Sequence, residues 1–494
     1  MSDPFCGRAR TRTELPLADQ IADQIFDVAV IGGGPAGYTA AFRAAQYGLK
    51  AALIEKTAKL GGTCLHVGCI PTKALLFNAE IWDHLQHAAS FGIGLGDAKP
   101  TLDWAAVQAR KDAIIAKHSK GLDFLTKKNK VTRIEGAASL TGPAAAGIHA
   151  VAVRNGAGET SSVQAKNVIL ATGSESKLFP GLVPDDRILT NIEILSLTAV
   201  PKSLIVIGAG AVGLEFASLF RTFGAEVTMV EFLPRVAPVE DEEVSKELTR
   251  LYKKRGIDVN TGAKVEKVER TESGVRVSWT DSNGRPQAKE AEKVLIAVGR
   301  APRTAGIGIE KTKIELERGF VKVDEAQQTA EPGVFAIGDA AAGLPQLAHV
   351  GAMAGMVAAA KIAGQPYRPI RRDRIPGCTY TEPQIGSVGL TETQAREKGY
   401  EVKIGKFPFA GNSKATILGN HDGFVKIVSE AKYGEILGVH ILGPQATELV
   451  AEAVAVLELE GTVEEMMFTI HAHPTLAESL LDAYASVEGK AINA

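Results

Sequence analysis

The sequence predicts an α/β protein made of two similar parallel-sheet domains followed by a C-terminal α+β domain. A strand–glycine–helix–strand–acid pattern begins at residue 26, and the same pattern returns at residue 203. After the proline-containing stretch 367–376, the sequence alternates between short strands and amphipathic helices. A chain of 494 residues is also too long for a single hydrophobic core, so several domains are expected.

The first repeat opens on the apolar, β-branched run FDVAVIG (26–32), which predicts a buried strand. Gly32, Gly34 and Gly37 follow in the G-x-G-x-x-G spacing, at the turn into an alanine-rich helix. A second strand ends at Glu55, where the dinucleotide fingerprint places a carboxylate that accepts a hydrogen bond from a ribose 2′-hydroxyl. The segment therefore predicts a Rossmann-like dinucleotide-binding domain.

The second repeat (203–231) carries its glycines at the same turn and ends its second strand at Glu231; these glycines are Gly208, Gly210 and Gly213. Two dinucleotide sites in one chain imply electron transfer between a flavin that stays bound and a nicotinamide that exchanges. A carboxylate at Glu231 favours NAD over NADP, because it accepts from a 2′-hydroxyl and repels a 2′-phosphate. Arg235 lies four residues on and could weaken that preference, although a solvated surface arginine is the simpler interpretation.

The domain boundaries follow from the strands and hairpins between the repeats. The runs VILATGS (168–174) and VLIAVGR (294–300) each close one unit, and 154–163 and 278–290 predict antiparallel hairpins. VFAIGDAA (334–341) adds one more strand. We therefore expect a leader over 1–24, the first dinucleotide domain over 25–174 and 299–368, the second over 175–298, and the C-terminal domain over 369–494.

Composition argues against several classes of protein. With 45% hydrophobic residues, 23% charged residues and a net charge of −2, nothing favours nucleic acid or an anionic membrane as partner. No apolar stretch is long enough to predict a membrane span, and the basic N-terminus lacks the apolar core of a secretory signal. Four cysteines are too few for a disulfide-stabilised secreted scaffold and favour a cytoplasmic compartment, with organellar targeting left open.

Cys64 and Cys69 lie within GGTCLHVGCIPTK (61–73), the strongest chemical feature of the chain. Such a pair could be half of a zinc site, a structural disulfide or a redox pair. Two further zinc ligands at recognisable spacing are missing, so we expect no metal. Five positions along an ideal helix turn a side chain about 140° away. A bridge would therefore need a distorted turn, which Gly68 would permit, and an accessible, strained bridge is the readily exchanged kind.

A second chemical feature is HAHPTLAE (471–478) near the C-terminus. Thr475 and Glu478 have the spacing of a helix-capping box. Alternatively, a histidine held by Glu478 takes a proton from a substrate thiol, because thiolate is the nucleophile in thiol–disulfide exchange. Asp339, at the end of the 334–338 strand, is likewise either a helix cap or a contact to a flavin. The residues alone leave both questions open.

Taken together, GGTCLHVGCIPTK, the two glycine fingerprints, the Gly338–Asp339 turn and HAHPTLAE resemble the FAD-dependent pyridine nucleotide–disulfide oxidoreductases. The resemblance runs from about residue 25 to the end of the chain, and its Cys-x4-Cys and HPTLAE motifs are highly specific. It implies tightly but non-covalently bound FAD, NAD as the second cofactor, and a homodimer joined by the C-terminal domain. Within the family, the chain is most similar to the branch that oxidises the dihydrolipoyl group carried by a protein domain of 2-oxo acid dehydrogenase or glycine cleavage complexes.

The resemblance also implies roles for individual residues. Cys64 would exchange with the substrate, Cys69 would face the flavin with Lys73 near its reactive edge, and His473, held by Glu478, would be the base in the partner subunit's active site. The FAD contacts would be Gly32, Gly34, Gly37, Glu55, Lys73, Gly136, Thr172, Gly173, Ser174, Asp339, Gln346, Leu347, Ala348 and His349. The NAD contacts would be Gly208, Gly210, Gly213, Glu215, Glu231, Val265 and Gly299.

Two positions depart from the usual pattern of that branch: His66 stands where asparagine is common, and Thr72 where serine is common. His66 is either a tolerated surface change or a second titratable group that alters the disulfide substrate. The nearest alternative function is an NADPH-dependent reductase of a small disulfide such as glutathione, against which Glu231 and the HPTLAE tail argue. A flavin-bearing scaffold subunit without turnover is an alternative of another class, against which the cysteine pair and second nucleotide site argue.

Overall fold

The computed structural model describes residues 24–94, 96 and 99–493, so the expected leader lies almost entirely outside the described residues. Packing divides the chain into two units. Unit 1 comprises the described residues up to Gly62, then Gly121–Gly173 and Pro302–Pro369. Unit 2 comprises Thr63–Lys120, Ser174–Ala301 and the chain from Ile370 onward. The finer boundaries expected at 174, 298 and 368 stay predictions.

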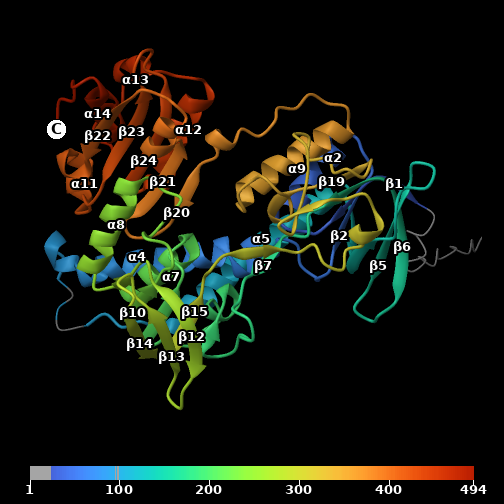
Figure 1. Ribbon diagram of the computed structural model, residues 1–494, viewed down its shortest axis with the longest axis horizontal. Coiled ribbons are helices and arrows are strands. Elements are labelled where there is room, and N and C mark those ends of the chain that lie inside the picture. Colours follow the sequence, from blue (N-terminus) through green and yellow to red (C-terminus); the bar gives the residue numbers. More distant parts are fainter. Residues whose placement is uncertain (1–23, 95, 97–98, 494) are drawn as a thin grey trace, which may run out of the picture. The chain divides into compact units, whose positions relative to one another are not determined.

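Unit 1 is built on one sheet in the order β3-β2-β1-β6-β5-β4, with β19 also beside β6 (Figure 1). Its parallel strands are β1 (Ile25–Ile31), β2 (Ala51–Glu55), β3 (Thr132–Glu135), β6 (Thr160–Leu170) and β19 (Val334–Ala336). Its antiparallel additions are β5 (His149–Arg154) and β4 (Ala137–Leu140). The pairing of Arg154 with Thr160 confirms the first predicted hairpin.

Two helices of unit 1, α2 (Pro35–Gln46) and α9 (Ala348–Ile362), pack closely against each other. Small residues make this approach possible. A Cβ added at Gly355 of α9 would lie 2.6 Å from the backbone oxygen of Ala36 and 3.2 Å from the Cβ of Ala40. The strand β1 is buried almost throughout, as expected for a parallel strand covered on both faces. This packing holds α2 closely against α9.

Unit 2 contains a second parallel sheet in the order β11-β10-β9-β15-β8. Its strands are β8 (Ile188–Leu189), β9 (Ser203–Ile207), β10 (Glu226–Val230), β11 (Asp258–Asn260) and β15 (Lys293–Ile296), and its helices are α7 (Ala211–Thr222) and α8 (Glu242–Lys254). An antiparallel sheet is formed by β12 (Lys264–Arg270), β13 (Val275–Thr280) and β14 (Pro286–Ala291). Pairing of β13 with β14 confirms the second predicted hairpin.

The C-terminal part of unit 2 is an antiparallel sheet in the order β20-β21-β24-β23-β22, as predicted for an α+β domain. Its strands are β20 (Gly377–Thr379), β21 (Gln384–Gly389), β22 (Val402–Pro408), β23 (Phe424–Glu430) and β24 (Ile436–Gly443). Its helices are α10 (Glu392–Glu397), α11 (Ser413–Leu418), α12 (Ala446–Glu458), α13 (Val463–Phe468) and α14 (Glu478–Val487). The helix α14 packs on β22 and β23, which places the HAHPTLAE segment at one end of this layer.

Where residues 62–128 are described, they form the α-helices α3 (Gly62–Val67), α4 (Cys69–Gln86) and α5 (Trp104–Lys128). The helix α4 packs on α7, where its Leu75 and Ala79 join a core cluster with Phe216 and Phe220. The remaining short elements are β7 (Ser174–Ser176), α6 (Asn191–Ile194), β16 (Arg300–Pro302), β17 (Leu316–Glu317) and β18 (Phe320–Val321), with 3-10 turns at Ala88–Phe91, Ile309–Lys311, Gly338–Ala340, Arg372–Arg374 and Phe409–Gly411.

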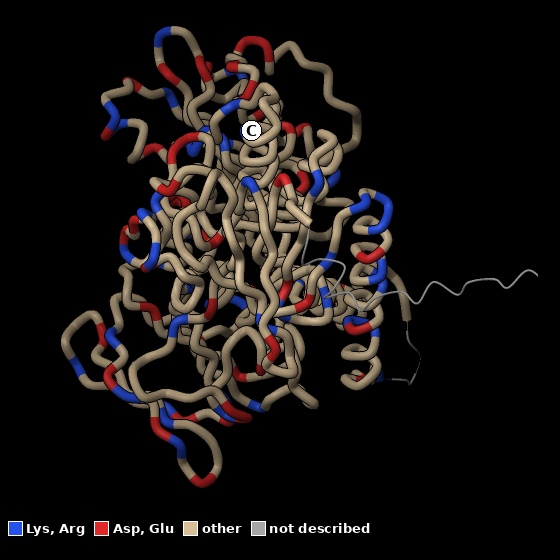
Figure 2. The backbone as a smooth tube through the Cα atoms, turned by 90° about the vertical axis from the view of Figure 1, so that its right-hand side faces the viewer, with Lys and Arg blue, Asp and Glu red and all other residues tan. Residues whose placement is uncertain are grey.

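Basic and acidic residues are interspersed along the backbone rather than segregated by sign, as Figure 2 shows. This distribution agrees with the near-neutral net charge of −2. None of the helices in the described part of the chain is long and apolar enough to cross a membrane.

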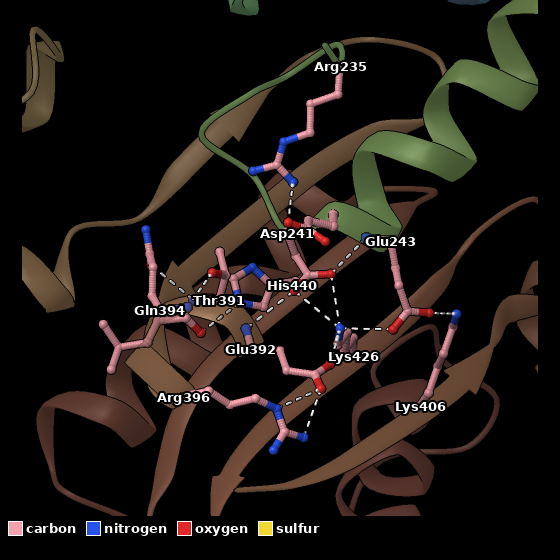
Figure 3. Close-up of polar contacts among 12 residues, drawn as sticks. Arg235, Asp241, Glu243, Thr391, Glu392, Gln394, Arg396, Lys406, Lys426 and His440 are labelled. Carbon is pink, nitrogen blue, oxygen red and sulfur yellow. Dashed lines mark hydrogen bonds and ion pairs between the residues drawn. The ribbon is translucent and has the colours of Figure 1, made fainter. Parts of the chain in front are cut away.

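A buried lysine connects α8 with the C-terminal sheet (Figure 3). Lys426 of β23 has a side chain only 2% exposed, and its ammonium lies 3.1 Å from Asp241, 2.8 Å from Glu243 and 2.9 Å from Glu392. Asp241 is also the N-cap of α8, since its side chain accepts from the backbone N–H of Glu243. The same carboxylate therefore caps the helix and anchors it to the sheet.

Candidate active site

The glycine fingerprint of unit 1 forms a turn that a larger residue would obstruct. Gly32 has a φ of +112°, and a Cβ added at Gly37 would lie 1.8 Å from the backbone oxygen of Gly32. Only glycine allows this positive φ and this close approach of helix to strand. The helix α2 starts at Pro35 without a side-chain cap, and an uncapped helix N-terminus binds an anion favourably.

The fingerprint of unit 2 repeats this geometry. Gly208 has a φ of +105°, and a Cβ added at Gly213 would lie 1.9 Å from the backbone oxygen of Gly208. Gly210 is the N-cap of α7, as Gly34 is of α2. Both turns thus have the cradle that a dinucleotide pyrophosphate requires.

The two strand-end acids also match. Glu55 accepts from the backbone N–H of Gly33 at 2.7 Å, and Glu231 accepts from that of Ala209 at 2.5 Å. Each carboxylate is therefore held next to its glycine turn by an equivalent hydrogen bond. Glu231 also accepts from the N–H of Leu233 at 2.7 Å. This is the position from which a carboxylate reaches an adenosine ribose in the dinucleotide fold.

Arg235 is directed into its own loop. It donates to the backbone oxygen of Pro238 at 3.0 Å, and its guanidinium lies 3.8 Å from Glu242. One guanidinium nitrogen is therefore used within the loop, while Nη1 is buried without a hydrogen-bond partner among the described residues.

The other residues expected to contact FAD divide between the units. In unit 1, the N–H of Gly136 donates to the backbone oxygen of Glu55 at 2.9 Å. The hydroxyl of Thr172 donates to the backbone oxygen of Arg303 at 2.6 Å. Gly173 has a φ of +73° in the same turn. Unit 2 contains Ser174, which was also expected to contact FAD. It also contains Val265 and Gly299, which were expected to contact NAD.

Asp339 lies within the 3-10 turn Gly338–Ala340, whose N-cap is Ile337, so it does not occupy the cap position that was one interpretation of it. The side-chain amide of Gln346 donates to the backbone oxygen of Asp339 at 3.3 Å. Leu347 caps α9, which starts with Ala348 and His349. The segment 346–349 thus leads directly into a helix N-terminus near Asp339.

Cys64 and Cys69 are brought together by a break between two helices. The helix α3 ends at Val67, and α4 begins at Cys69, with Gly68 as its N-cap. A Cβ added at Gly68 would lie 2.8 Å from the backbone oxygen of Thr63, so the sharp turn needs glycine. This confirms the expected distortion of the helix. His66 lies half-buried in α3, and the Thr72 hydroxyl donates to the oxygen of Gly68 at 2.7 Å.

The two thiols are hydrogen-bonded and electrostatically unequal. The hydrogen bond from Cys64, followed by the charge of Lys73, lowers the pKa of Cys69 to about 7, although burial acts in the opposite direction. The same hydrogen bond and burial raise the pKa of the Cys64 thiol. Near neutral pH the pair therefore favours a thiolate on Cys69 with the proton on Cys64, and thiolate is the reactive form of cysteine.

Lys73 forms a close ion pair with Glu215 of α7. Its ammonium lies 2.7 Å from both carboxylate oxygens, and the Glu215 side chain is 6% exposed. Lys73 follows Cys69 by one helical turn, so both side chains lie on the same face of α4. The two oxygens of Glu215, which was expected to contact NAD, are thus occupied by Lys73, and one also accepts from the N–H of Tyr380.

His473 and Glu478 form the expected pair. The Nδ1 atom of His473 lies 2.9 Å from a carboxylate oxygen of Glu478, whose other oxygen accepts from the N–H of Thr475 at 2.8 Å. One of the two hydrogen bonds of a capping box, from the N–H of Thr475 to Glu478, is therefore present, although α14 begins at Glu478 itself. The His473 ring is 72% exposed, which leaves it available to a substrate or a partner.

The neighbouring His471 has a different environment. Its side chain is only 5% exposed, Nε2 lies 3.1 Å from Glu452, and Nδ1 lies 2.9 Å from the oxygen of Thr469. The hydrogen bond with Glu452 raises the pKa of His471. Both ring nitrogens of His471 are therefore used within the fold, whereas the second nitrogen of His473 faces outward.

Figure 1 shows α4, whose first residue is Cys69, and α14, which begins five residues after His473, in different parts of unit 2. Residues that sequence reasoning missed are Tyr380, beside Lys73 and Glu215, and Asn191, which donates to the oxygen of Val67 at the end of α3. Neither carries a local motif. An aromatic residue directly after a strand was the available signal for Tyr380.

Residues 26–355 match the family model described as pyridine nucleotide-disulphide oxidoreductase. The chain belongs to this family. Residues 375–484 match the model of the dimerisation domain of pyridine nucleotide-disulphide oxidoreductases. The glycine cradles, the cysteine pair and the His473–Glu478 pair described above are therefore features of an oxidoreductase with a dimerisation domain.

Individual relatives cover almost the whole chain. The dihydrolipoyl dehydrogenase of Bacillus subtilis is 42% identical over 474 residues, covering 95% of this chain and 99% of the relative. The dihydrolipoyl dehydrogenase of Chlorobaculum tepidum is 43% identical over 467 residues, covering 94% and 97%. Among solved structures, LpdA of Mycobacterium tuberculosis superposes with a TM-score of 0.85 at 29% identity, covering 92% of this chain and 98% of that one.

Proposed function

We propose that this protein is a dihydrolipoyl dehydrogenase, a homodimeric flavoprotein that oxidises protein-bound dihydrolipoamide and reduces NAD to NADH. The proposal is carried by the Cys64–Cys69 pair, two hydrogen-bonded thiols of unequal pKa beside a lysine, in a chain 42–43% identical to enzymes of that name. The reaction removes two electrons and two protons from a dithiol, closes it to a disulfide, and delivers a hydride to NAD and a proton to solvent.

The dithiol chemistry uses the residues as follows. A thiolate of the substrate attacks Cys64 of the oxidised pair, and Cys69 leaves as a thiolate, stabilised by Lys73. The second substrate thiol then attacks the mixed disulfide, which releases the lipoyl disulfide and leaves Cys64 reduced. His473 accepts the substrate proton, and Glu478 holds its Nδ1–H so that Nε2 is the basic nitrogen.

The glycine cradles and strand-end acids would hold the cofactors. In unit 1, the Gly32–Gly37 turn and Glu55 fit the pyrophosphate and ribose of FAD, with the remaining predicted contacts around Asp339 and 346–349. In unit 2, the Gly208–Gly213 turn and Glu231 fit the pyrophosphate and ribose of NAD. When bound, FAD supplies the two-electron chemistry that connects a dithiol to a nicotinamide. Glu215 supports Lys73, so we expect its effect on NAD to be indirect.

We further propose that the dithiol substrate is the lipoyl group of a protein domain in a 2-oxo acid dehydrogenase or glycine cleavage complex, and that the enzyme works in a cytoplasmic compartment. The name shared by the relatives supports the first part, and the sparse cysteines support the second. The exposed His473 ring supports a site that is shared between two subunits.

Steady-state assays test the function directly. The purified dimer should oxidise dihydrolipoamide with NAD far faster than it reduces glutathione disulfide with NADPH. Cys64→Ser and Cys69→Ser should each abolish the first reaction while the flavin stays bound. A preference for NADPH and glutathione disulfide would favour the small-disulfide reductase instead. A flavin spectrum that does not bleach with NADH would indicate a subunit without turnover.

A further inference from the structure

The ammonium of Lys73 has two kinds of partner. Both oxygens of Glu215 lie 2.7 Å from its Nζ atom. Nζ also lies over the ring of Tyr380, 4.6 Å from the ring centroid. A cation within about 6 Å of an aromatic centroid is attracted by the negative face of the ring. Lys73 therefore has an aromatic partner in addition to its carboxylate.

Tyr380 contacts both members of the ion pair by different groups. Its ring faces Lys73, and its backbone N–H donates to Glu215 at 3.0 Å. It directly follows β20, the edge strand of the C-terminal sheet, whereas Lys73 and Glu215 belong to α4 and α7. A residue of the C-terminal domain thus completes the surroundings of the ion pair next to Cys69.

We propose that Tyr380 is a positioning residue, which holds the Lys73 ammonium at Glu215, one helical turn from Cys69 along α4, through the face of its ring. Only the role of Tyr380 in turnover rests on the proposed function. Its contacts with Lys73 and Glu215 affect the Cys69 thiolate whether or not the protein turns over this substrate. The position of Lys73 matters because the two members of the ion pair act on Cys69 in opposite directions: Lys73 favours the thiolate and Glu215 disfavours it. Without the ring, the flexible lysine side chain would spread over more conformations, and its average field at Cys69 would weaken.

The ring face, not the hydroxyl, is the part that acts. Burial raises the pKa of Tyr380, so its hydroxyl stays protonated and carries no charge near Lys73 at neutral pH. Phenylalanine offers the same face, whereas leucine offers none. The pair Tyr380→Phe and Tyr380→Leu therefore separates the contribution of the ring from that of the hydroxyl.

The test is the pH dependence of iodoacetamide alkylation at Cys69, in the full-length reduced dimer carrying Cys64→Ser, quantified by mass spectrometry. Tyr380→Phe should leave the midpoint within about 0.2 pH units of the parent, and Tyr380→Leu should raise it by about 0.5–1 unit. In a Lys73→Met background, Tyr380→Leu should cause no shift, because the ring then has no cation to hold. Cys378, whose pKa burial raises to about 11, should stay unreactive below pH 9 and reports on unfolding.

An unchanged midpoint in Tyr380→Leu would overturn the proposal, as would an equal shift in the Lys73→Met background, which would indicate a general packing effect. If Tyr380→Leu does not fold, Tyr380→Met serves in its place with the same expectations. The alkylation midpoint does not require turnover. A dimer that shows the expected midpoints but does not oxidise dihydrolipoamide would contradict the proposed function and leave the role of Tyr380 standing.

Discussion

Two histidines two positions apart show how the environment of a residue selects its role. His471 uses both ring nitrogens inside the fold and is held by Glu452, whereas His473 uses only Nδ1, toward Glu478, and exposes most of its ring. A proton acceptor for a substrate needs a free nitrogen within reach of solvent or a partner. The geometry therefore supports His473 as the base and His471 as a structural residue.

Substitution of the two histidines should separate these roles. His473→Gln should lower kcat for dihydrolipoamide oxidation about 10²–10⁴-fold, because the general base is lost. Reduction of the bound flavin by NADH should continue, since it needs no thiol deprotonation. His471→Gln is the matched control and should keep kcat within a few-fold while it lowers stability by about 1 kcal/mol through the weakened bond to Glu452. Equal losses of kcat in both variants would contradict the assignment.

At the scale of elements, α8 is anchored to the C-terminal sheet by the Lys426 cluster (Figure 3). Lys426 is 2% exposed and lies within 3.1 Å of three carboxylates, while His440 beside it is buried and has a lowered pKa, because burial disfavours its charged form. Lys426 is therefore the cation that compensates Asp241 at the start of α8. Since α8 follows the loop that begins at Glu231, the anchor also restrains that loop, which comes directly after β10.

Removal of this cation should be costly. Lys426→Met leaves the buried Asp241 carboxylate without its partner, and we expect a loss of about 3 kcal/mol in the free energy of unfolding. Lys406→Met is the matched control, because Lys406 pairs with the same Glu243 from a side chain that is 42% exposed. That variant should lose at most about 1 kcal/mol. Urea unfolding of both variants provides the measurement, and similar midpoints would show that burial of Lys426 has no special importance.

The same cluster predicts a pH dependence. The hydrogen bond from Lys426 lowers the pKa of Glu392, and the pKa of Asp241 is also lowered, because Lys426 and other neighbours outweigh its burial. A carboxylate whose pKa is lower in the folded state contributes stability above its unfolded pKa and loses it as the pH falls through the folded value. The difference in unfolding midpoint between wild type and Lys426→Met should thus be largest near pH 7 and shrink below about pH 4. A difference that stays constant down to pH 3 would contradict this.

The sequence predicted the elements whose cause is local. The turns at Gly32 and Gly208 follow from glycine spacing beside buried strands, and the break at Gly68 follows from helix geometry between two cysteines. The contacts that were missed join distant segments: Tyr380 meets Glu215 across 165 positions, and Lys426 meets Asp241 across 185. A lysine in a strand normally indicates a solvent-facing position, so its burial could not be read from the sequence. Glu215 likewise meets Lys73 across 142 positions, a contact that no local motif indicates, and its expected contact with NAD stays a prediction.

At the scale of the whole molecule, the C-terminal part of unit 2 leaves large apolar side chains exposed. Leu459, Phe468 and Ile470 are 82%, 78% and 96% exposed in the single chain, along the segment that leads to His473. Such exposure of several large apolar side chains along one segment is typical of a surface covered by another molecule. The match to a dimerisation domain supports a second copy of this chain as that molecule.

Mixed dimers test whether the site is shared between two chains. Cys69→Ser and His473→Gln chains, each inactive alone, are co-expressed with different tags and purified as mixed dimers. If each site takes its cysteines from one chain and its histidine from the partner, one of the two sites is intact, and about half of the wild-type activity should return. The reciprocal dimer pairs a wild-type chain with a chain carrying both substitutions, and it should be inactive because each site then has one defect. If the residues instead acted within one chain, the two results would be exchanged: the first dimer would be inactive and the second would keep half of the activity.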